Sequence, residues 1–162
     1  MSDWVNTIRT VADGDIDRLG HVNNAVYLRW IEDAVHGHWT GLSTPAEFVA
    51  YAWVAVRHEI DYRRPAHVAE RLDIKTRIVG IRRARAWYET VVSRGDTMLA
   101  DARSCWCCID ARTHRMTVIP ADAAARFLPA GGGGRAIHGP LSRGSPPGLA
   151  TPPPGMPIPD CG

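Results

Sequence analysis

The sequence predicts an α+β fold in which one long helix packs against an antiparallel sheet. Apolar residues recur at helical spacing over residues 24–39, which indicates a helix of about four turns. Residues 53–62 and 71–81 alternate between apolar and polar side chains, as strands do. Residues 84–94 and 97–110 are rich in β-forming side chains and are separated only by a short turn. Short connections join antiparallel neighbours, so we expect one antiparallel sheet.

The helix over residues 24–39 is expected to be largely buried. Either Asn23 or Asn24 is suited to cap its N-terminus, because an Asn side chain accepts a hydrogen bond from a free N–H there. A helix with so little polar surface should be wrapped by a larger element, which here is the sheet. The apolar stripe and the residues that widen it are Ala25, Leu28, Ile31, Ala34 and Val35, with Val26, Tyr27 and Trp30.

Three shorter elements complete the predicted domain. Residues 4–11 form a first strand and residues 115–119 a last, short one. Pro120 suits the first turn of a small helix that runs to Phe127. The alternation over residues 53–62 places five side chains on one face, and the imidazole among them is expected to be a hydrogen-bonded core group. These five are Val54, Val56, His58, Ile60 and Tyr62.

Composition favours an ordinary globular protein. The chain has 162 residues, 45% of them hydrophobic, and a formal net charge of +2, which gives no reason to expect nucleic acid or a polybasic membrane anchor. No apolar run approaches the ~20 residues that span a bilayer. The N-terminal residues are polar and lack the apolar centre of a signal peptide. We therefore expect a cytoplasmic protein without a membrane partner.

The chain divides into two segments of different composition. Residues 1–129 carry the predicted helices and strands and are expected to form one domain. In residues 130–162, nine Gly and eight Pro occupy 17 of 33 positions. Such a segment buries too little apolar surface to offset its loss of entropy, so we expect a disordered tail.

Three of the four cysteines, Cys105, Cys107 and Cys108, crowd one predicted strand. Zinc sites favour C-x-x-C pairs with matching ligands elsewhere, and this spacing does not provide them. Buried thiols are therefore the prediction, and no metal or other cofactor is expected.

Two motifs carry the chemistry of the sequence. The first reads D-x-D-x-x-G-H-V-N-N-x-x-Y-L from Asp15 to Leu28, and the second reads E-I-D-Y-R-R-P-A from Glu59 to Ala66. Together they resemble the hotdog-fold acyl-CoA thioesterases of the 4-hydroxybenzoyl-CoA thioesterase type, over roughly residues 5–128. The resemblance implies a curled antiparallel sheet of five to six strands wrapped around one long central helix. It also implies a homodimer or homotetramer with active sites between subunits.

That resemblance implies hydrolysis of an acyl-CoA thioester to the free acid and CoA. Asp17 matches the family's nucleophile or general base, and both roles remain open. His21 is expected to orient Asp17 or to position water, and the backbone N–H of Asn24 is the best match to the family's oxyanion donor. The alternative for Asp17 and His21 is a structural role in the loop. Asp15 is expected to hold the loop in place.

Four arginines and one tyrosine are candidates for substrate binding. Arg63 and Arg64 close the second motif, and Arg82 and Arg83 lie at a predicted hairpin turn. Guanidinium groups pair well with the phosphates of CoA, although basic turns are also common simply because they are solvated. Tyr27 is expected to reach the acyl pocket or to pack in the core.

Two other functions stay open. The plant acyl-carrier-protein thioesterases share the HVNN and YRR pieces, but they have an Asn at the position of Leu19 and a catalytic Glu at the position of Pro65. Both groups are missing here, which weakens an acyl-carrier-protein substrate without removing it. A non-catalytic hotdog subunit that binds acyl-CoA is the second alternative. A hotdog dehydratase or hydratase fits less well, because those enzymes have a different motif.

Overall fold

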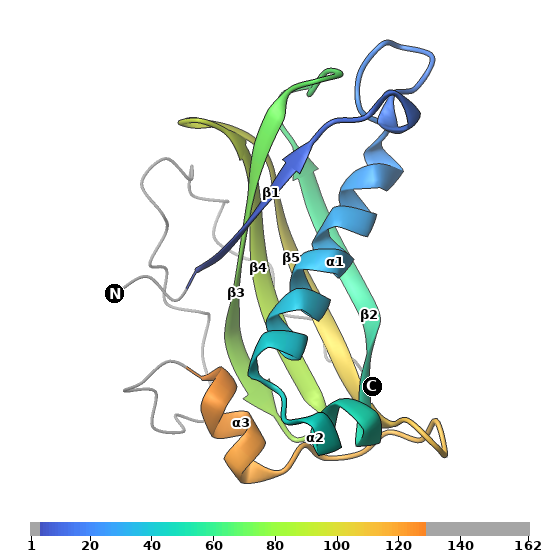
Figure 1. Ribbon diagram of the computed structural model, residues 1–162, viewed down its shortest axis with the longest axis vertical. Helices are drawn as coiled ribbons and strands as arrows, with labels where there is room; N and C mark the ends of the chain where they lie inside the picture. The colour runs from blue at the N-terminus through green and yellow to red at the C-terminus, as the bar shows by residue number, and fades with distance from the viewer. Residues whose placement is uncertain (1–3, 129–162) are drawn as a thin grey trace, which may run out of the picture. The chain divides into compact units, whose positions relative to one another are not determined.

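The structure is a computed structural model that describes residues 4–128. The predicted tail over residues 130–162 lies outside the described residues and stays a prediction. Figure 1 shows one long helix beside a sheet, with two short helices at one end. In chain order the elements are β1 (Val5–Thr10), η1 (Asp13–Asp15), α1 (Asn24–Leu42), α2 (Pro45–Ala50), β2 (Tyr51–Tyr62), β3 (Arg71–Arg82), β4 (Arg85–Arg94), β5 (Thr97–Asp110) and α3 (Ala121–Phe127).

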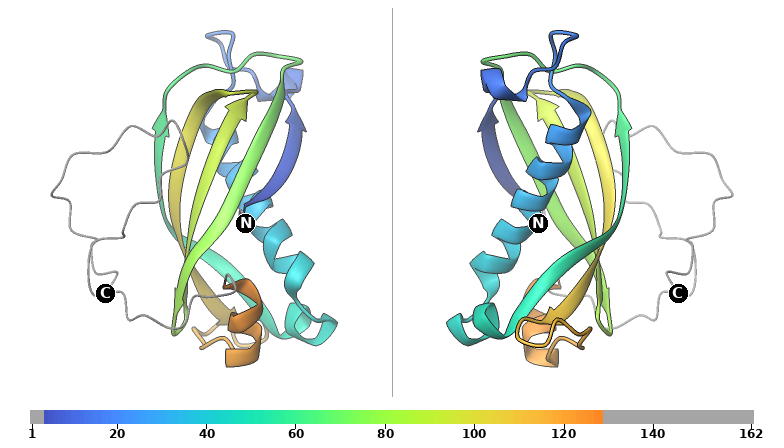
Figure 2. Two further views of the ribbon diagram at one scale, coloured as in Figure 1. Left: turned by 90° about the vertical axis from the view of Figure 1, so that its left-hand side faces the viewer. Right: turned by 90° about the vertical axis from the view of Figure 1, so that its right-hand side faces the viewer.

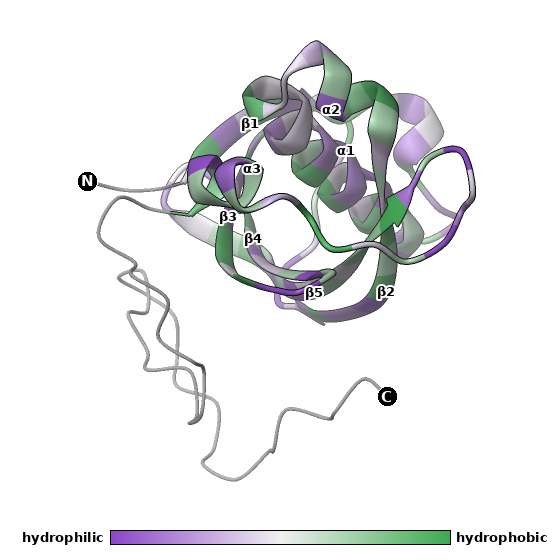
Figure 3. Cartoon of the chain, turned by 90° about the horizontal axis from the view of Figure 1, so that it is seen from below, coloured by the Kyte–Doolittle hydropathy of each residue, from purple (hydrophilic) through white to green (hydrophobic). Residues whose placement is uncertain are grey.

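The five strands form one sheet in the order β1-β3-β4-β5-β2, and every neighbouring pair is antiparallel. Tight hairpins join β3 to β4 and β4 to β5, whereas β1 and β2 lie at the two edges. The sheet curls, and α1 lies in its concave face (Figure 2). Figure 3 shows the strands arranged in an arc around α1. The predicted arrangement, a long helix held by a curled antiparallel sheet, is confirmed.

One face of α1 is buried against this sheet. The buried residues are Val26, Tyr27, Trp30, Ile31, Ala34, Val35, His38 and Trp39. Of the predicted stripe, Ala25 is exposed and Leu28 is half-buried. The opposite face, which carries Arg29, Glu32 and Asp33, is exposed. Within one chain, the sheet therefore covers one side of the helix and does not surround it.

Two clusters of buried side chains hold α1 to the sheet, one near each end of the helix. Tyr27 and Trp30 belong to the cluster under the N-terminal half. Trp39, Trp106 and Phe127 belong to the second cluster, which includes α3. The rings of Trp39 and Phe127 stack with centroids 4.9 Å apart and an interplanar angle of 19°. Buried aromatic side chains contribute large contact areas, so these clusters anchor both ends of the helix.

A bulge in β2 changes which of its side chains face α1. The pairing of β2 with β5 shifts register between Ala55 and Arg57, which inserts one residue and reverses the alternation locally. Val54 and Val56 are therefore 46% and 45% exposed, while Trp53 is only 8% exposed. The predicted inward face was wrong for these two valines. Sequence alternation alone does not reveal an inserted residue.

His58 does not have the hydrogen bonds expected of a core imidazole. Both ring nitrogens are buried, and no described residue hydrogen-bonds to them. The nearest carboxylate is Glu32 of α1, whose Oε1 lies 4.0 Å from Nε2. Burial lowers the pKa of His58, and the charge of Glu32 opposes that shift. The expectation of a satisfied imidazole was wrong for the chain taken by itself.

The predicted last strand over residues 115–119 is not a strand. Its only ladder contact among the described residues is an isolated bridge between Met116 and Ile109. Of the apolar residues in segment 115–119, Ile119 is buried, whereas Met116 and Val118 are exposed. The helix that follows, Ala121–Phe127, is confirmed.

Helix α2 was not predicted, although the sequence contains a signal for it. Thr44 accepts a hydrogen bond from the Glu47 N–H, and the Glu47 side chain accepts one from the Thr44 N–H. This reciprocal capping box, with Pro45 in the first turn, starts a short helix. The pattern T-P-x-E was the available sign.

His38 makes stability depend on pH. It is buried in the second half of α1, its Nδ1 lies 3.0 Å from the Tyr88 hydroxyl, and burial lowers its pKa. The unfolded imidazole, with a pKa of about 6.5, binds a proton that the folded one excludes. The free energy of unfolding should therefore fall as pH drops below about 6.5. Urea denaturation in steps of about one-half pH unit between pH 8 and pH 5 measures this change in the free energy of unfolding.

The matched pair for this measurement is His38→Gln and His36→Gln. His36 lies on the exposed face of the same helix. We expect His38→Gln to reduce the loss of stability at low pH without abolishing it, because burial also lowers the pKa of His58. An unchanged pH dependence in His38→Gln would contradict the assignment.

Candidate active site

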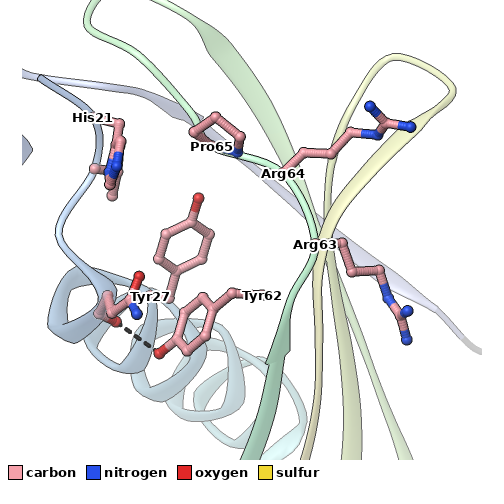
Figure 4. A pocket seen from close by; sticks show the side chains of 8 residues that line it. His21, Tyr27, Tyr62, Arg63, Arg64 and Pro65 are labelled. Atoms are coloured by element: carbon pink, nitrogen blue, oxygen red, sulfur yellow. Dashed lines mark hydrogen bonds between the residues drawn. The ribbon is translucent and has the colours of Figure 1, made fainter. Parts of the chain in front are cut away.

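A pocket of about 230 Å³ opens where the N-terminus of α1 meets the C-terminal end of β2 (Figure 4). Its lining comes from the two segments that carry the sequence motifs. The structure thus brings together five of the eight predicted site residues. The lining residues are His21, Val22, Asn24, Tyr27, Tyr62, Arg63, Arg64 and Pro65.

A tight turn before α1 positions Asp17 and His21. The Asp17 N–H donates to the His21 carbonyl at 2.9 Å, and the Gly20 N–H donates to the Asp17 carbonyl at 3.0 Å. Gly20 has a φ of +82°, a conformation that residues with a side chain rarely adopt. A bridge between Ile16 and Val22 closes the base of the turn. Asp17 and His21 therefore lie opposite one another.

Asp17 lies close to His21 but does not line the pocket. Its Oδ1 accepts a hydrogen bond from the Leu19 N–H at 2.8 Å and lies 3.9 Å from His21 Nδ1. The Asp17 side chain is 22% exposed. It is not among the lining residues, whereas His21 is. Within one chain, Asp17 thus braces its own turn, and its neighbour His21 lines the pocket.

The first turn of α1 begins at Asn24, which lines the pocket and whose backbone N–H has no partner among the described residues. Asn23 caps the helix, because its Oδ1 accepts from the Ala25 N–H at 2.9 Å, and its carbonyl accepts from the Val26 N–H at 2.9 Å. No acceptor for the Asn24 N–H is found among residues 4–128. The helix dipole adds partial positive charge at this position. The Asn24 N–H can therefore stabilise an oxygen on which negative charge develops.

Asp15 fastens the turn to α1, in agreement with its predicted role. Its Oδ1 accepts a hydrogen bond from Arg29 of the helix at 2.9 Å, and its Oδ2 accepts from the Ala12 N–H at 3.0 Å. The Asp15 carbonyl also accepts from the Asn23 N–H at 2.9 Å. The turn, the cap and the helix are thereby held as one unit.

The two arginines at the end of β2 differ in their partners. Arg63 is committed to Asp101, whose Oδ1 lies 2.5 Å from its Nε, and this hydrogen bond raises the pKa of Arg63. Arg64 makes no side-chain hydrogen bond or ion pair within the described part of the chain. Both side chains point away from the tyrosines (Figure 4). Arg64 is therefore the one free to bind an anionic ligand.

Arg82 and Arg83 are not part of this pocket. They lie at the hairpin between β3 and β4, at the end of the sheet opposite the N-terminus of α1 (Figure 1). A strand of 12 residues separates the two ends, which corresponds to about 36 Å or more of extended chain. The two arginine pairs of one chain therefore do not bind the same group.

Two tyrosines form the inner wall of the pocket, and only Tyr27 was singled out from the sequence. The Tyr27 ring is buried, and burial, with a smaller contribution from Tyr62, raises the pKa of its hydroxyl. Tyr62 packs edge-on against Tyr27, with ring centroids 5.4 Å apart. Its hydroxyl donates to the Asn24 carbonyl at 3.0 Å. The position of Tyr62 in the second motif, beside Arg63, was the available signal.

Within residues 4–128, no group of three or more His, Cys, Asp or Glu side chains is arranged to hold a metal ion. The thiols of Cys105, Cys107 and Cys108 are buried in β5, as predicted. None of the helices in this range is long and apolar enough to cross a membrane.

The fold corresponds to a known class of protein. A family model described as the thioesterase-like superfamily, of the 4HBT type, matches residues 11–127, which is more than half of the chain. The chain belongs to this superfamily. It is also 32% identical over 107 residues to the long-chain acyl-CoA thioesterase FadM of Escherichia coli (strain K12), a match that covers 62% of this chain and 79% of that protein.

Solved structures support the same fold. A thioesterase from Thermus thermophilus, complexed with coenzyme A and Zn, superposes with a TM-score of 0.68 at 27% identity, over 78% of this chain and 94% of that one. A 4-hydroxybenzoyl CoA thioesterase variant, complexed with 4-hydroxybenzoyl CoA, gives a TM-score of 0.70 at 21% identity, over 78% of this chain and 100% of that one. The predicted hotdog fold and the predicted class of thioester hydrolase are confirmed.

Removing the cap of α1 should destabilise the protein. Asn23→Ala deletes the acceptor of the Ala25 N–H, and loss of an Asn cap costs about 1 kcal/mol. Asn24→Ala is the matched control, because the Asn24 side chain does not cap the helix. Urea denaturation of both variants measures the difference. Equal stability of Asn23→Ala and Asn24→Ala would contradict the assignment of the cap.

Proposed function

We propose that the protein is an acyl-CoA thioesterase that releases free acid and CoA at the pocket where α1 begins. One observation carries this proposal: Asn24 lines the pocket, its N–H has no partner among the described residues, and His21, the neighbour of Asp17, lines the same pocket. Thioester hydrolysis needs this combination of an oxyanion donor and a group that activates or replaces water. The similarity to a long-chain acyl-CoA thioesterase supports the same substrate class.

In the proposed reaction, the thioester carbonyl oxygen accepts a hydrogen bond from the Asn24 N–H. Asp17, as a general base, takes a proton from water, and the water oxygen attacks the carbonyl carbon. The negative charge that develops on the carbonyl oxygen is stabilised by the helix N-terminus. The C–S bond then breaks, and the CoA thiolate takes up the proton. His21, 3.9 Å from Asp17, orients the carboxylate or the water.

The alternative role for Asp17 is that of a nucleophile. Its carboxylate would attack the thioester carbon, expel the CoA thiolate and form a mixed anhydride that water hydrolyses. Single-turnover hydrolysis in water enriched in the heavy oxygen isotope separates the two routes. Label in the Asp17 carboxylate indicates the anhydride, whereas label confined to the acid product favours direct attack by water.

The proposal includes a second copy of the chain, as a homodimer or homotetramer. β2 is an edge strand, so one side of its backbone is unpaired in the single chain. If two copies pair antiparallel along β2, the far end of each sheet lies beside the pocket end of the other. Arg82 and Arg83 of one copy would then approach the pocket of its neighbour. This arrangement would let all four predicted arginines serve CoA binding.

A second function is supported by the position of Asp17. Because Oδ1 is already bonded to the Leu19 N–H and the side chain does not line the pocket, a subunit that binds acyl-CoA without turnover is the competing proposal. The two proposals differ in thiol release. An acyl-CoA panel of short, long and aromatic chains, followed with a thiol-reactive dye, separates them.

Asp17→Asn should lower kcat by about 10²- to 10⁴-fold, which is the usual contribution of general acid–base catalysis. Asp13→Asn is the matched control, since Asp13 is an exposed carboxylate of the preceding short helix. Thiol release and the urea midpoint are measured for both variants. Wild-type turnover in Asp17→Asn would rule out Asp17 as the general base or nucleophile. Binding of acyl-CoA without turnover in the unmodified protein would support the non-catalytic subunit.

Arg64→Gln should raise the KM for acyl-CoA by about tenfold, the equivalent of about 1.4 kcal/mol for one lost charge-assisted contact. Arg63→Gln should raise it less, because Arg63 is held by Asp101. The two variants are compared at low and high salt. Equal effects of both substitutions would contradict the assignment of Arg64 as the free cation.

A further inference from the structure

Tyr62, the last residue of β2, connects the edge of the sheet to the first residue of α1. Its hydroxyl donates a hydrogen bond to the Asn24 carbonyl at 3.0 Å, as the dashed line in Figure 4 shows. The edge-on contact with Tyr27, at an interplanar angle of 81°, fixes the plane of the ring. Burial raises the pKa of the Tyr62 hydroxyl, which therefore remains a donor at neutral pH.

The acceptor of this hydrogen bond belongs to the backbone that forms the proposed oxyanion site. The Asn24 carbonyl shares its peptide unit with the Ala25 N–H, and the Ala25 N–H donates to the Asn23 side chain at 2.9 Å. A donor on the carbonyl polarises this peptide and strengthens the bond that its N–H makes. Tyr62 thus supports the cap from the far side of the same peptide.

The preceding peptide unit carries the Asn24 N–H itself. Its carbonyl, that of Asn23, accepts from the Val26 N–H at 2.9 Å. The peptide units on both sides of the Asn24 α-carbon are therefore held by hydrogen bonds, one through Val26 and one through Tyr62. A hydrogen-bond donor in an active site is most effective when its direction is set before the substrate arrives.

The hydrogen bond from Tyr62 ties down the end of an edge strand. β2 pairs with β5 only, and a bulge interrupts that pairing. Beyond Tyr62, the chain is joined to the motif turn by the Val22 N–H, which donates to the Ala66 carbonyl at 2.9 Å. The hydroxyl of Tyr62 adds a side-chain hydrogen bond between the end of β2 and the first residue of α1.

We propose that Tyr62 is a positioning residue for the reaction: its hydroxyl fixes the peptide units around Asn24 and thereby aims the Asn24 N–H at the thioester oxygen. This inference rests on the proposed function of the pocket. Tyr62 acts through the backbone of Asn24 and does not contact the reacting atoms. The hydrogen bond matters most in the transition state, so its loss should lower kcat and leave KM nearly unchanged.

The test compares Tyr62→Phe with Tyr51→Phe. Phe keeps the ring and its contact with Tyr27 and removes only the hydroxyl. Tyr51 is the first residue of the same strand, at the opposite end from the pocket. We expect kcat to fall about tenfold in Tyr62→Phe, the upper range for one neutral hydrogen bond, with KM within about twofold of the original protein. Tyr51→Phe should leave both constants unchanged.

Two further measurements separate positioning from simple structural support. Amide hydrogen exchange at Asn24 and Ala25 should be faster in Tyr62→Phe than in Tyr51→Phe. In a double-mutant cycle, Asn23→Ala and Tyr62→Phe should have non-additive effects on kcat, because both act on the same peptide. Additive effects would show that the hydroxyl and the cap act independently and would overturn the proposal.

The remaining outcomes are also decisive. A rise in KM with unchanged kcat in Tyr62→Phe would mean that the Tyr62 hydroxyl binds substrate directly. Unchanged kcat and KM would mean that the hydroxyl does not contribute. Either result overturns the positioning role. If the unmodified protein releases no thiol from any acyl-CoA, the proposed function fails, and the positioning role in catalysis fails with it. Activity in the unmodified protein with a wild-type-like Tyr62→Phe variant overturns the positioning role alone.

Discussion

The N-terminus of α1 is the constraint on which the rest of the site depends. A helix begins with free N–H groups that must find partners or stay open to solvent and ligands. Here the Asn23 side chain accepts from the Ala25 N–H and the Asn23 carbonyl accepts from the Val26 N–H. The N–H of Asn24, which lines the pocket, has no partner among the described residues. An N–H left free at a helix end is a hydrogen-bond donor that carries partial positive charge before any ligand binds. The neighbouring elements hold this end of the helix in place.

Packing and hydrogen bonding together hold the N-terminus of α1 in place. The cluster around Tyr27 and Trp30 seats the helix on the concave face of the sheet, and the hydrogen bonds of Asp15 attach the preceding turn to the helix. Apolar burial is strong but non-directional, so it sets the depth of the helix and not the direction of a single N–H. Directional bonds, including the one from Tyr62, are needed for the latter.

The long, periodic elements could be predicted from the sequence, and the local exceptions could not. The helix and the strands over residues 71–110 follow from periodicity, and the structure confirms them. Side-chain chemistry predicted an Asn cap at residue 23 or 24, and the structure shows that Asn23 is the cap. The exposed valines of β2 were misassigned, because one inserted residue reverses an alternation without changing its composition. The buried nitrogens of His58 were misjudged, because sequence shows that a position is buried but not which partners reach it.

The family, the helix with its polar N-terminal turn and the residues of both motifs could be read from the sequence, because these depend on short-range spacing and on side-chain chemistry. Which of those residues share a pocket follows from the tertiary structure alone. It brought Tyr62 to the Asn24 carbonyl, committed Arg63 to Asp101 and placed Arg82 at the opposite end of the sheet. Such juxtapositions depend on strand register and on the curl of the sheet, which are set by pairing between distant segments and are not encoded in local spacing.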